Sequence, residues 1–334
     1  MAAMPPAPAS PSGGLPLIPF NRPTMAGREL EYVRRAVEGG HTSAAGPFSR
    51  QVADLLREAH GAADVILTTS CTDALEMAAL LLDHRPGDTV IVPSFTFVST
   101  ALAFAREGFG LVFADIEPVH LGLDAAHVAS LIDHTTRAIV TVHYGGIACD
   151  LPGLERAIAD RPIDLLEDNA HGLFATYQGR MLGTFGRLAT LSFHETKNFT
   201  CGEGGALILN QQRDLDRAHV LLHKGTNRRA FMLGEVDKYS WHDLGSSFGL
   251  SEMNAAFLLA QLEARQAILA RRREVFDGYD RLLRPQAAAL GLTLPEVPAG
   301  DVPGYHLYFV LLPNRAARDR VLAEMRAAGV MATF

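Results

Sequence analysis

Cysteine is scarce in this chain of 334 residues, and its three copies form no recognisable motif. Cys71, Cys149 and Cys201 lie far apart, so the sequence has no CxxC pair of the kind found in zinc and redox sites. Isolated thiols in an odd number favour reduced cysteines. We therefore expect a cytoplasmic protein without a disulfide framework.

Long apolar runs are absent as well. No segment approaches the roughly 20 apolar residues that a membrane-spanning helix needs. The chain up to residue 15 is rich in proline, alanine, serine and glycine, and it lacks the basic and apolar regions of a signal peptide. We expect no membrane association and a disordered tail over residues 1–16.

Positive charge is in deficit, because 30 lysines and arginines face 37 aspartates and glutamates, which gives a net charge of −7. A field of this sign repels polyphosphates and anionic lipids. We therefore expect no nucleic-acid partner. The common ligand motifs are missing too: no GxGxxG fingerprint, Walker A loop or HExxH helix occurs, and we predict no metal site.

Short β-branched segments alternate with helical segments from residue 64 onward. The first strands are predicted at Val65–Thr68, Val90–Val92 and Leu111–Phe113, with helices between them. This alternation is typical of a parallel sheet with crossover helices. The strands Leu188–Phe193 and Ala206–Leu209 are separated by a glycine-rich loop instead of a helix, which indicates an antiparallel pair.

The last part of the chain has a different pattern. Helical spacing continues over Ser251–Leu283, and a strand at Tyr305–Leu312 and a helix at Arg315–Ala328 follow. We predict a large, mostly parallel sheet domain over residues 17–249 and a smaller C-terminal α/β domain over 250–334. Because the chain stops at the start of a new strand, we expect this second domain to be incomplete.

Polar segments fall where ligands of an open parallel sheet collect, beyond the carboxyl ends of the strands. Cys71 and Thr72 open a helix, where hydroxyl and backbone N–H donors can bind a phosphate, although helix capping is the commoner role of such residues. Phe97 can lie flat against a planar ring or pack in the core. Asp168, after an apolar strand, can hold a heterocyclic nitrogen protonated or cap a turn.

Lysine is nearly replaced by arginine in this sequence: Lys197, Lys224 and Lys238 stand against 27 arginines. A guanidinium stays charged and cannot form a Schiff base, whereas a desolvated amine can lose its proton and attack a carbonyl. Lys197 follows a strand, precedes a glycine-rich loop and lies five residues after Ser192, a candidate phosphate ligand. A phosphate site, a flat aromatic, a carboxylate and a lysine together match pyridoxal 5′-phosphate (PLP).

The same residues resemble the DegT/DnrJ/StrS sugar aminotransferases. The resemblance runs from about Ile18 to Phe334. It is carried by IPFNRP (18–23), TTSCTDALEMAALLL (68–82), PSFTFVSTALAF (93–104), VHYGG (142–146), EDNAHG (167–172), SFHETKN (192–198), GEGGA (202–206), KGTNR (224–228) and VDKYSWHDLGSS (236–247). It implies the α/β fold of PLP enzymes of fold type I, which is that of aspartate aminotransferase.

The resemblance also implies roles for single residues. Lys197 matches the Schiff-base lysine and Asp168 the partner of the pyridine nitrogen. The other cofactor contacts that it implies are Cys71, Thr72 and Ser192 at the phosphate, Phe97 stacked on the ring, and His171 on the ring-hydroxyl side. Asn227 matches a residue that reaches the phosphate in the neighbouring subunit, which implies a homodimer with shared sites. Arg228, Tyr239 and Trp241 are candidates for contacting a nucleotide sugar.

The function implied is transfer of an amino group from glutamate to the C4 ketone of a nucleotide-linked 4-keto-6-deoxy sugar. Three alternatives stay open. A 3-dehydratase of the same fold lacks the Schiff-base lysine, so Lys197 argues against it. A PLP enzyme acting on another keto sugar, or a non-catalytic protein that binds PLP or a sugar nucleotide, would carry many of the same residues.

Overall fold

The computed structural model describes residues 17–334, and the tail predicted at 1–16 lies outside the described residues. Its centre is a seven-stranded sheet in the order β1-β9-β8-β5-β4-β2-β3. The strands are β1 (Asp64–Thr68), β2 (Thr89–Pro93), β3 (Gly110–Ala114), β4 (Thr136–Val142), β5 (Asp164–Asp168), β8 (Leu188–Ser192) and β9 (Gly205–Leu209). Neighbouring strands are parallel except where β9 pairs with β1 and β8, which confirms the predicted α/β class and the antiparallel pair.

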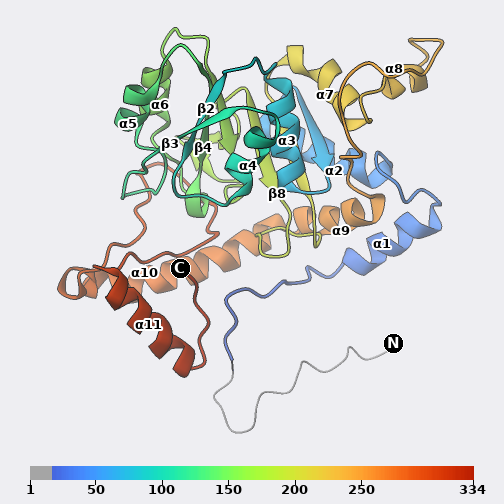
Figure 1. The fold of residues 1–334 in the computed structure, drawn as a ribbon. Coiled ribbons are helices and arrows are strands. Elements are labelled where there is room, and N and C mark those ends of the chain that lie inside the picture. The colour runs from blue at the N-terminus through green and yellow to red at the C-terminus, as the bar shows by residue number, and fades with distance from the viewer. Residues whose placement is uncertain (1–16) are drawn as a thin grey trace.

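Helices cover both faces of the sheet (Figure 1). They are α1 (Glu29–Glu38), α2 (Pro47–His60), α3 (Cys71–Leu81), α4 (Ser99–Arg106), α5 (Ala125–Leu131), α6 (Leu151–Ile158), α7 (Leu215–Leu222), α8 (Arg228–Met232), α9 (Glu252–Glu263), α10 (Arg265–Leu290) and α11 (Arg315–Ala327). Among residues 17–334, none of these helices has the length and apolar character needed to cross a bilayer.

Successive side chains of a strand point to opposite faces of the sheet and pack in separate hydrophobic cores. Val65 and Leu67 of β1 pack with α1, α2 and α9, whereas Ile66 packs with α3, α4 and α7 on the other face. Ile139 of β4 and Leu165 of β5 pack with α5 and α6. Burying a side chain of this size stabilises the fold by roughly 1.5–3 kcal/mol, so the sheet is a firm platform for residues at its ends.

The helix that faces the strand ends begins at a serine cap. The Ser70 hydroxyl accepts a hydrogen bond from the backbone N–H of Asp73 at 3.0 Å, which satisfies one of the free donors of the first turn. The N–H groups of Cys71 and Thr72, at the first two helical positions, precede the first intrahelical donor and need another acceptor.

Predictions for the C-terminal part are wrong in two places. The helix predicted over Ser251–Leu283 is divided into α9 and α10, because Ala264 at their junction has non-helical backbone angles (φ −86°, ψ 7°). The strand predicted over Tyr305–Leu312 does not form: Tyr305 has a left-handed φ of 51°, and Leu311 alone in this stretch makes a bridge, to Thr293.

Candidate active site

The carboxyl ends of β4, β5 and β8 meet at one edge of the sheet. Val142 at the end of β4 pairs with Asp168 of β5, and Asp168 pairs in turn with Thr190 of β8. The N-termini of α3 and α4 are joined beside them, since the hydroxyls of Thr72 and Ser99 lie 2.8 Å apart. The strand-end segments singled out from the sequence therefore converge at this edge.

Asp168 is buried at this edge, with 5% of its surface exposed. The Thr100 hydroxyl donates to its Oδ2 at 2.7 Å, and the Ala170 N–H donates to its Oδ1 at 3.2 Å. Burial raises the pKa of Asp168, although these hydrogen bonds and the charge of Lys197 oppose the rise. A cationic N–H placed against this carboxylate would restore its preference for the charged form.

Lys197 lies in the loop between β8 and β9 and is partly buried. Burial lowers the pKa of its ammonium group, while the charge of Asp168 acts in the opposite direction. A lowered pKa increases the fraction of uncharged amine at neutral pH, and only that form attacks a carbonyl. Each charge shifts the pKa of the other group, so Lys197 and Asp168 lie at the same end of the sheet.

A close backbone approach shapes the first turn of α3, where the sequence predicts phosphate contacts. A Cβ added at Gly205 of β9 would lie 2.4 Å from the backbone nitrogen of Cys71, so only glycine fits there. Ser192 pairs with Gly205, which places the end of β8 beside the first turn of α3. Burial raises the pKa of the Cys71 thiol, so it stays uncharged and does not repel a phosphate.

Aromatic side chains surround His171. The ring of Tyr144 meets it edge to face with centroids 5.5 Å apart, and Phe95 packs on Tyr144 at 4.7 Å. Burial lowers the pKa of His171 to about 3, so the ring is neutral. Its Nδ1 accepts the N–H of Gly145 at 3.2 Å and the proton is therefore on Nε2, which makes His171 a hydrogen-bond donor at that atom.

A buried ion pair lies behind Asp168, and the sequence reasoning missed it. His143 Nε2 lies 2.9 Å from Glu167 Oε2, and both side chains are fully buried. Backbone N–H groups of Gly183, Phe185 and Gly186 donate to the same carboxylate at 2.6–2.7 Å. These bonds lower the pKa of Glu167. The signal was available, because His143 and Glu167 stand in the VHYGG and EDNAHG strings.

A model of the DegT/DnrJ/EryC1/StrS aminotransferase family matches residues 23–334. The chain belongs to this family. The resemblance noted in the sequence is thereby confirmed, and with it the fold of PLP-dependent aminotransferases.

Three relatives illustrate this membership in the DegT/DnrJ/EryC1/StrS family. The spore coat polysaccharide biosynthesis protein SpsC of Bacillus subtilis is 29% identical over 303 residues, which are 90% of this chain and 77% of that protein. The aminotransferase TlmJ from Streptoalloteichus hindustanus is 30% identical, with a TM-score of 0.85 over 94% of this chain and 83% of its own. The putative sugar aminotransferase Spr1654 of Streptococcus pneumoniae in its PLP form, 23% identical, shares the fold, with a TM-score of 0.84 over 94% and 83% of the two chains.

PLP is the cofactor of this DegT/DnrJ/EryC1/StrS aminotransferase. The residues at the sheet edge fit the group. Thr190 Oγ1 is buried beside Asp168 without a hydrogen-bond partner, and the first turn of α3 offers donors of the kind that bind phosphate. Lys197 would supply an amine for the aldehyde, and Asp168 an anion for the pyridine nitrogen.

Phe97, the predicted stacking aromatic, stands between β2 and α4 with 76% of its surface exposed. The ring makes no aromatic contact with the described residues. An exposed phenyl ring beside a ligand site can gain contact area when a planar ring binds. Its stacking role stays a prediction.

The other predicted residues lie apart from Lys197, on the segment around α8 that projects from the body of the molecule (Figure 1). Asn227 Nδ2 donates to the Lys238 carbonyl at 2.9 Å, and its Oδ1 accepts the Ser240 N–H at 2.7 Å. Arg228 begins α8, and Tyr239 and Trp241 are 47% and 79% exposed. Within residues 17–334, no hydrogen bond or ion pair joins this segment to Lys197.

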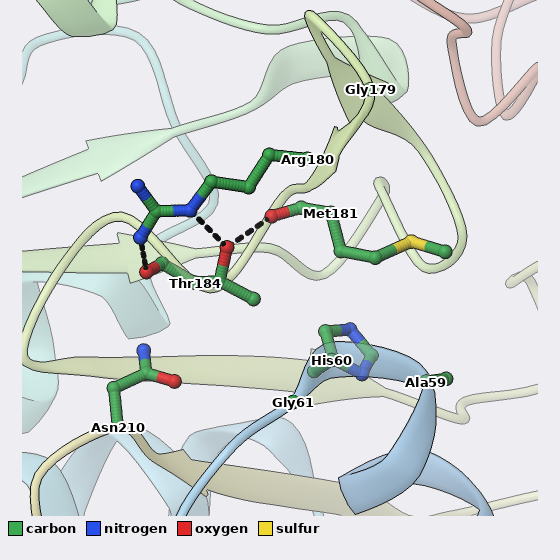
Figure 2. A pocket seen from close by; sticks show the side chains of 8 residues that line it. All are labelled: Ala59, His60, Gly61, Gly179, Arg180, Met181, Thr184 and Asn210. Atoms are coloured by element: carbon green, nitrogen blue, oxygen red, sulfur yellow. Dashed lines mark hydrogen bonds between the residues drawn. The ribbon is translucent and has the colours of Figure 1, made fainter.

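A surface pocket lies elsewhere, between the end of α2 and the β6–β7 hairpin (Thr176–Tyr177 and Arg180–Met181), as Figure 2 shows. His60 and Asn210 in its lining come before β1 and after β9, which is the sheet edge opposite Lys197. Arg180 bonds Thr184, so the polar groups of the hairpin satisfy one another. The part of the chain that the structure describes has no cluster suited to a metal ion.

Proposed function

We propose that this aminotransferase moves an amino group from glutamate to the C4 ketone of a nucleotide-linked 4-keto-6-deoxy sugar. Its motifs resemble those of dTDP-4-amino-4,6-dideoxygalactose transaminase, so dTDP-4-keto-6-deoxyglucose is the first substrate to test. The observation that supports the proposal is the partly buried Lys197 amine beside the buried Asp168 carboxylate at one sheet edge. Membership in the family supports the aminotransferase activity, and the sequence motifs support the sugar substrate.

When bound, PLP accepts the amino group and stores the electron pair released at the carbon that loses a proton. Lys197 would hold the cofactor through its amine, and as a free amine it could take a proton from one carbon and return it to another. Asp168 would hold the pyridine nitrogen protonated, and the Thr100 hydroxyl, which donates to Oδ2 at 2.7 Å, fixes the orientation of that carboxylate. His171 would donate from Nε2 to the ring hydroxyl.

The proposed contacts to the nucleotide sugar lie on the segment around α8. Arg228 offers a guanidinium for the diphosphate, and Tyr239 and Trp241 offer exposed rings for the sugar or the base. The relative SpsC is named for polysaccharide biosynthesis, which supports a role in making a cell-surface polysaccharide. The three free cysteines support a cytoplasmic location.

We further infer that the active unit is a homodimer in which each site takes residues from both subunits. The segment around α8 exposes large apolar side chains, which are Phe231, Met232, Leu233, Tyr239, Trp241 and Leu244. Exposed apolar groups in such number are typical of interaction surfaces. Asn227 lies in the same segment and retains one amide hydrogen after its two contacts, which is free to bind a phosphate in the partner subunit.

The test is a panel of keto sugar nucleotides incubated with the purified enzyme and glutamate and analysed by mass spectrometry. The proposal predicts conversion of a 4-keto-6-deoxy sugar nucleotide to the 4-amino sugar and formation of 2-oxoglutarate. Conversion of a different keto sugar alone would favour the alternative of a PLP enzyme that acts on another keto sugar. A protein whose cofactor spectrum does not change when glutamate is added would be a binding protein.

A further inference from the structure

The segment 302–306, which follows α10, lies directly against the active-site edge. The Gly304 N–H donates to the carbonyl of Gly146 at 2.8 Å. A Cβ added at Gly146 would lie 2.6 Å from the carbonyl oxygen of His171, and one added at Gly304 would lie 2.7 Å from it. Neither position can carry a side chain without displacing the backbone, so glycines allow the segment to reach this edge.

Asn198 joins this segment to the loop of Lys197. Its Nδ2 donates to the Gly304 carbonyl at 2.5 Å, and its Oδ1 lies 2.9 Å from His306 Nδ1. A carbonyl can only accept, so the amide nitrogen must face Gly304 and the amide oxygen must face the imidazole. An amide oxygen also only accepts, and His306 therefore carries its proton on Nδ1.

The His306 ring also covers His171. The two rings are stacked, with centroids 4.3 Å apart and an interplanar angle of 27°. Burial lowers the pKa of both imidazoles, so both rings are neutral. His171 then has a donor at Nε2 and His306 an acceptor at Nε2, because each ring uses its Nδ1 for a protein contact.

The backbone of His306 is held from two further sides. Its N–H donates to the Gly145 carbonyl at 3.3 Å, and its own carbonyl lies 3.4 Å from Arg272 Nη1 on α10. Upstream, Val302 and Thr176 exchange backbone hydrogen bonds of 2.8 and 3.1 Å. His306 thus connects α10 and the turn after β4 through its backbone, and the Lys197 loop through its imidazole.

We propose that His306 is a positioning residue of this aminotransferase: through Asn198 it holds the backbone that carries Lys197, and through its ring it holds His171. The inference rests on the proposed role of Lys197 as the amine that bonds the cofactor. It assigns to the C-terminal part of the chain a direct contribution to the geometry of the reacting groups.

The test compares H306A, H306N and H306Q. The asparagine amide nitrogen takes the place of Nδ1, whereas that of glutamine lies one carbon farther out. For H306A we expect kcat to fall about 100-fold, the effect of a displacement of roughly 1 Å at a reacting group, with KM for the nucleotide sugar nearly unchanged. H306N should recover most of the loss, and H306Q should not.

A second readout needs no turnover, namely the pH midpoint of the visible absorption band of the bound cofactor. Water that enters at position 306 favours the charged form of the lysine nitrogen, so H306A should raise this midpoint by about one pH unit. H306N should leave it close to that of the unchanged enzyme. As a control, H219A removes a partly buried histidine that bonds Asp64 away from the site, and it should leave both the midpoint and kcat unchanged.

Two outcomes would overturn the inference: H306A with unchanged kcat and midpoint, or H306N and H306Q impaired to the same degree. If H306A fails to fold, the comparison of H306N with H306Q decides alone. A cofactor found on a lysine other than Lys197 after borohydride reduction would overturn the proposed function itself, whereas attachment at Lys197 with an unaffected H306A would overturn only the role of His306.

Discussion

Burial sets the charge of the side chains at the sheet edge, and each shift suits a different task. The ammonium of Lys197 is disfavoured, so a reactive amine is available. The carboxylate of Asp168 is also disfavoured by burial, but a cationic ring nitrogen against it reverses that preference. Burial alone thus favours the uncharged form of both groups.

Replacing Asp168 by asparagine tests the first of these tasks. The amide keeps the shape and accepts from Thr100, so D168N should still bind the cofactor. It cannot stabilise a protonated pyridine nitrogen, and we expect kcat to fall by about 100-fold or more. Steady-state kinetics with glutamate measures this loss, and near-normal kinetics would show that Asp168 is not the partner of the ring.

Sequence reasoning works well for single residues at the ends of strands. The rarity of lysine singled out Lys197 and the strand-end position singled out Asp168, and the charges of the two groups influence one another in the structure, while their roles stay predictions. The contacts of Thr100 and His306 were not predicted, because they join segments far apart in the chain and no local pattern reveals such partners.

At the scale of elements, β5 supports two different environments with successive residues. Glu167 and Asp168 point to opposite faces of the sheet, so one carboxylate bonds His143 and the other faces the ligand side. Burial would lower the pKa of His143, but the Cys149 thiol and, after it, the Glu167 carboxylate raise that pKa to about 10. The His143–Glu167 pair thus holds the end of β5 on the face of the sheet opposite Asp168.

Replacing Glu167 by glutamine leaves the buried His143 without its counter-charge. Removal of one partner from a buried ion pair costs about 3–5 kcal/mol. Near pH 6, the free energy of unfolding of E167Q should therefore be lower than that of the unchanged protein by about this amount. Urea unfolding at several pH values measures it. As a control, E38Q removes an exposed partner of Arg34 and should change stability little.

The pH dependence of this loss has a definite sign. The raised pKa of His143 means that its stabilisation is complete below the ordinary value of 6.5 and disappears as pH rises through about 10. The lowered pKa of Glu167 means that its stabilisation is present above the ordinary value of 4.5 and is lost as pH falls below it. The difference between the two proteins should therefore narrow toward pH 10, and a constant difference would contradict the ion pair.

Elements were predicted best where apolar runs and glycine loops gave a clear period, as in the strands of the main sheet. α1 and α2 were not predicted, although Pro47 at the start and Gly61 after the end of α2 are ordinary boundary signals. The strand expected at Tyr305–Leu312 failed because Tyr305 adopts a positive φ to deliver His306 to the site. Tertiary contacts decided that segment, and they are not visible in its local sequence.

At the scale of the whole molecule, the segment around α8 extends away from the site that it is expected to serve (Figure 1). Its exposed apolar side chains and the contacts of Asn227 make sense if a second subunit covers it. Each site of such a dimer would be complete only when the two subunits are assembled. The division into domains at residue 249 stays a prediction.

Mixed dimers test the sharing of sites. K197A lacks the amine and N227A lacks the residue expected to reach the partner's phosphate, so each homodimer should be nearly inactive. A heterodimer has one site with both residues, and random mixing should restore about a quarter of normal activity. Coexpression with two different tags supplies the mixture, and activity that stays at the level of the parents would mean that Asn227 serves its own subunit.

The central claim is that Lys197 is the amine that bonds the cofactor. It is tested most directly by reducing the PLP-loaded protein with borohydride, digesting it and locating the modified lysine by mass spectrometry. The expected result is a single modified peptide that contains Lys197, with Lys224 and Lys238 unmodified and no modification in K197A. A cofactor attached at Lys224 or Lys238, or an adduct that persists in K197A, would contradict the account.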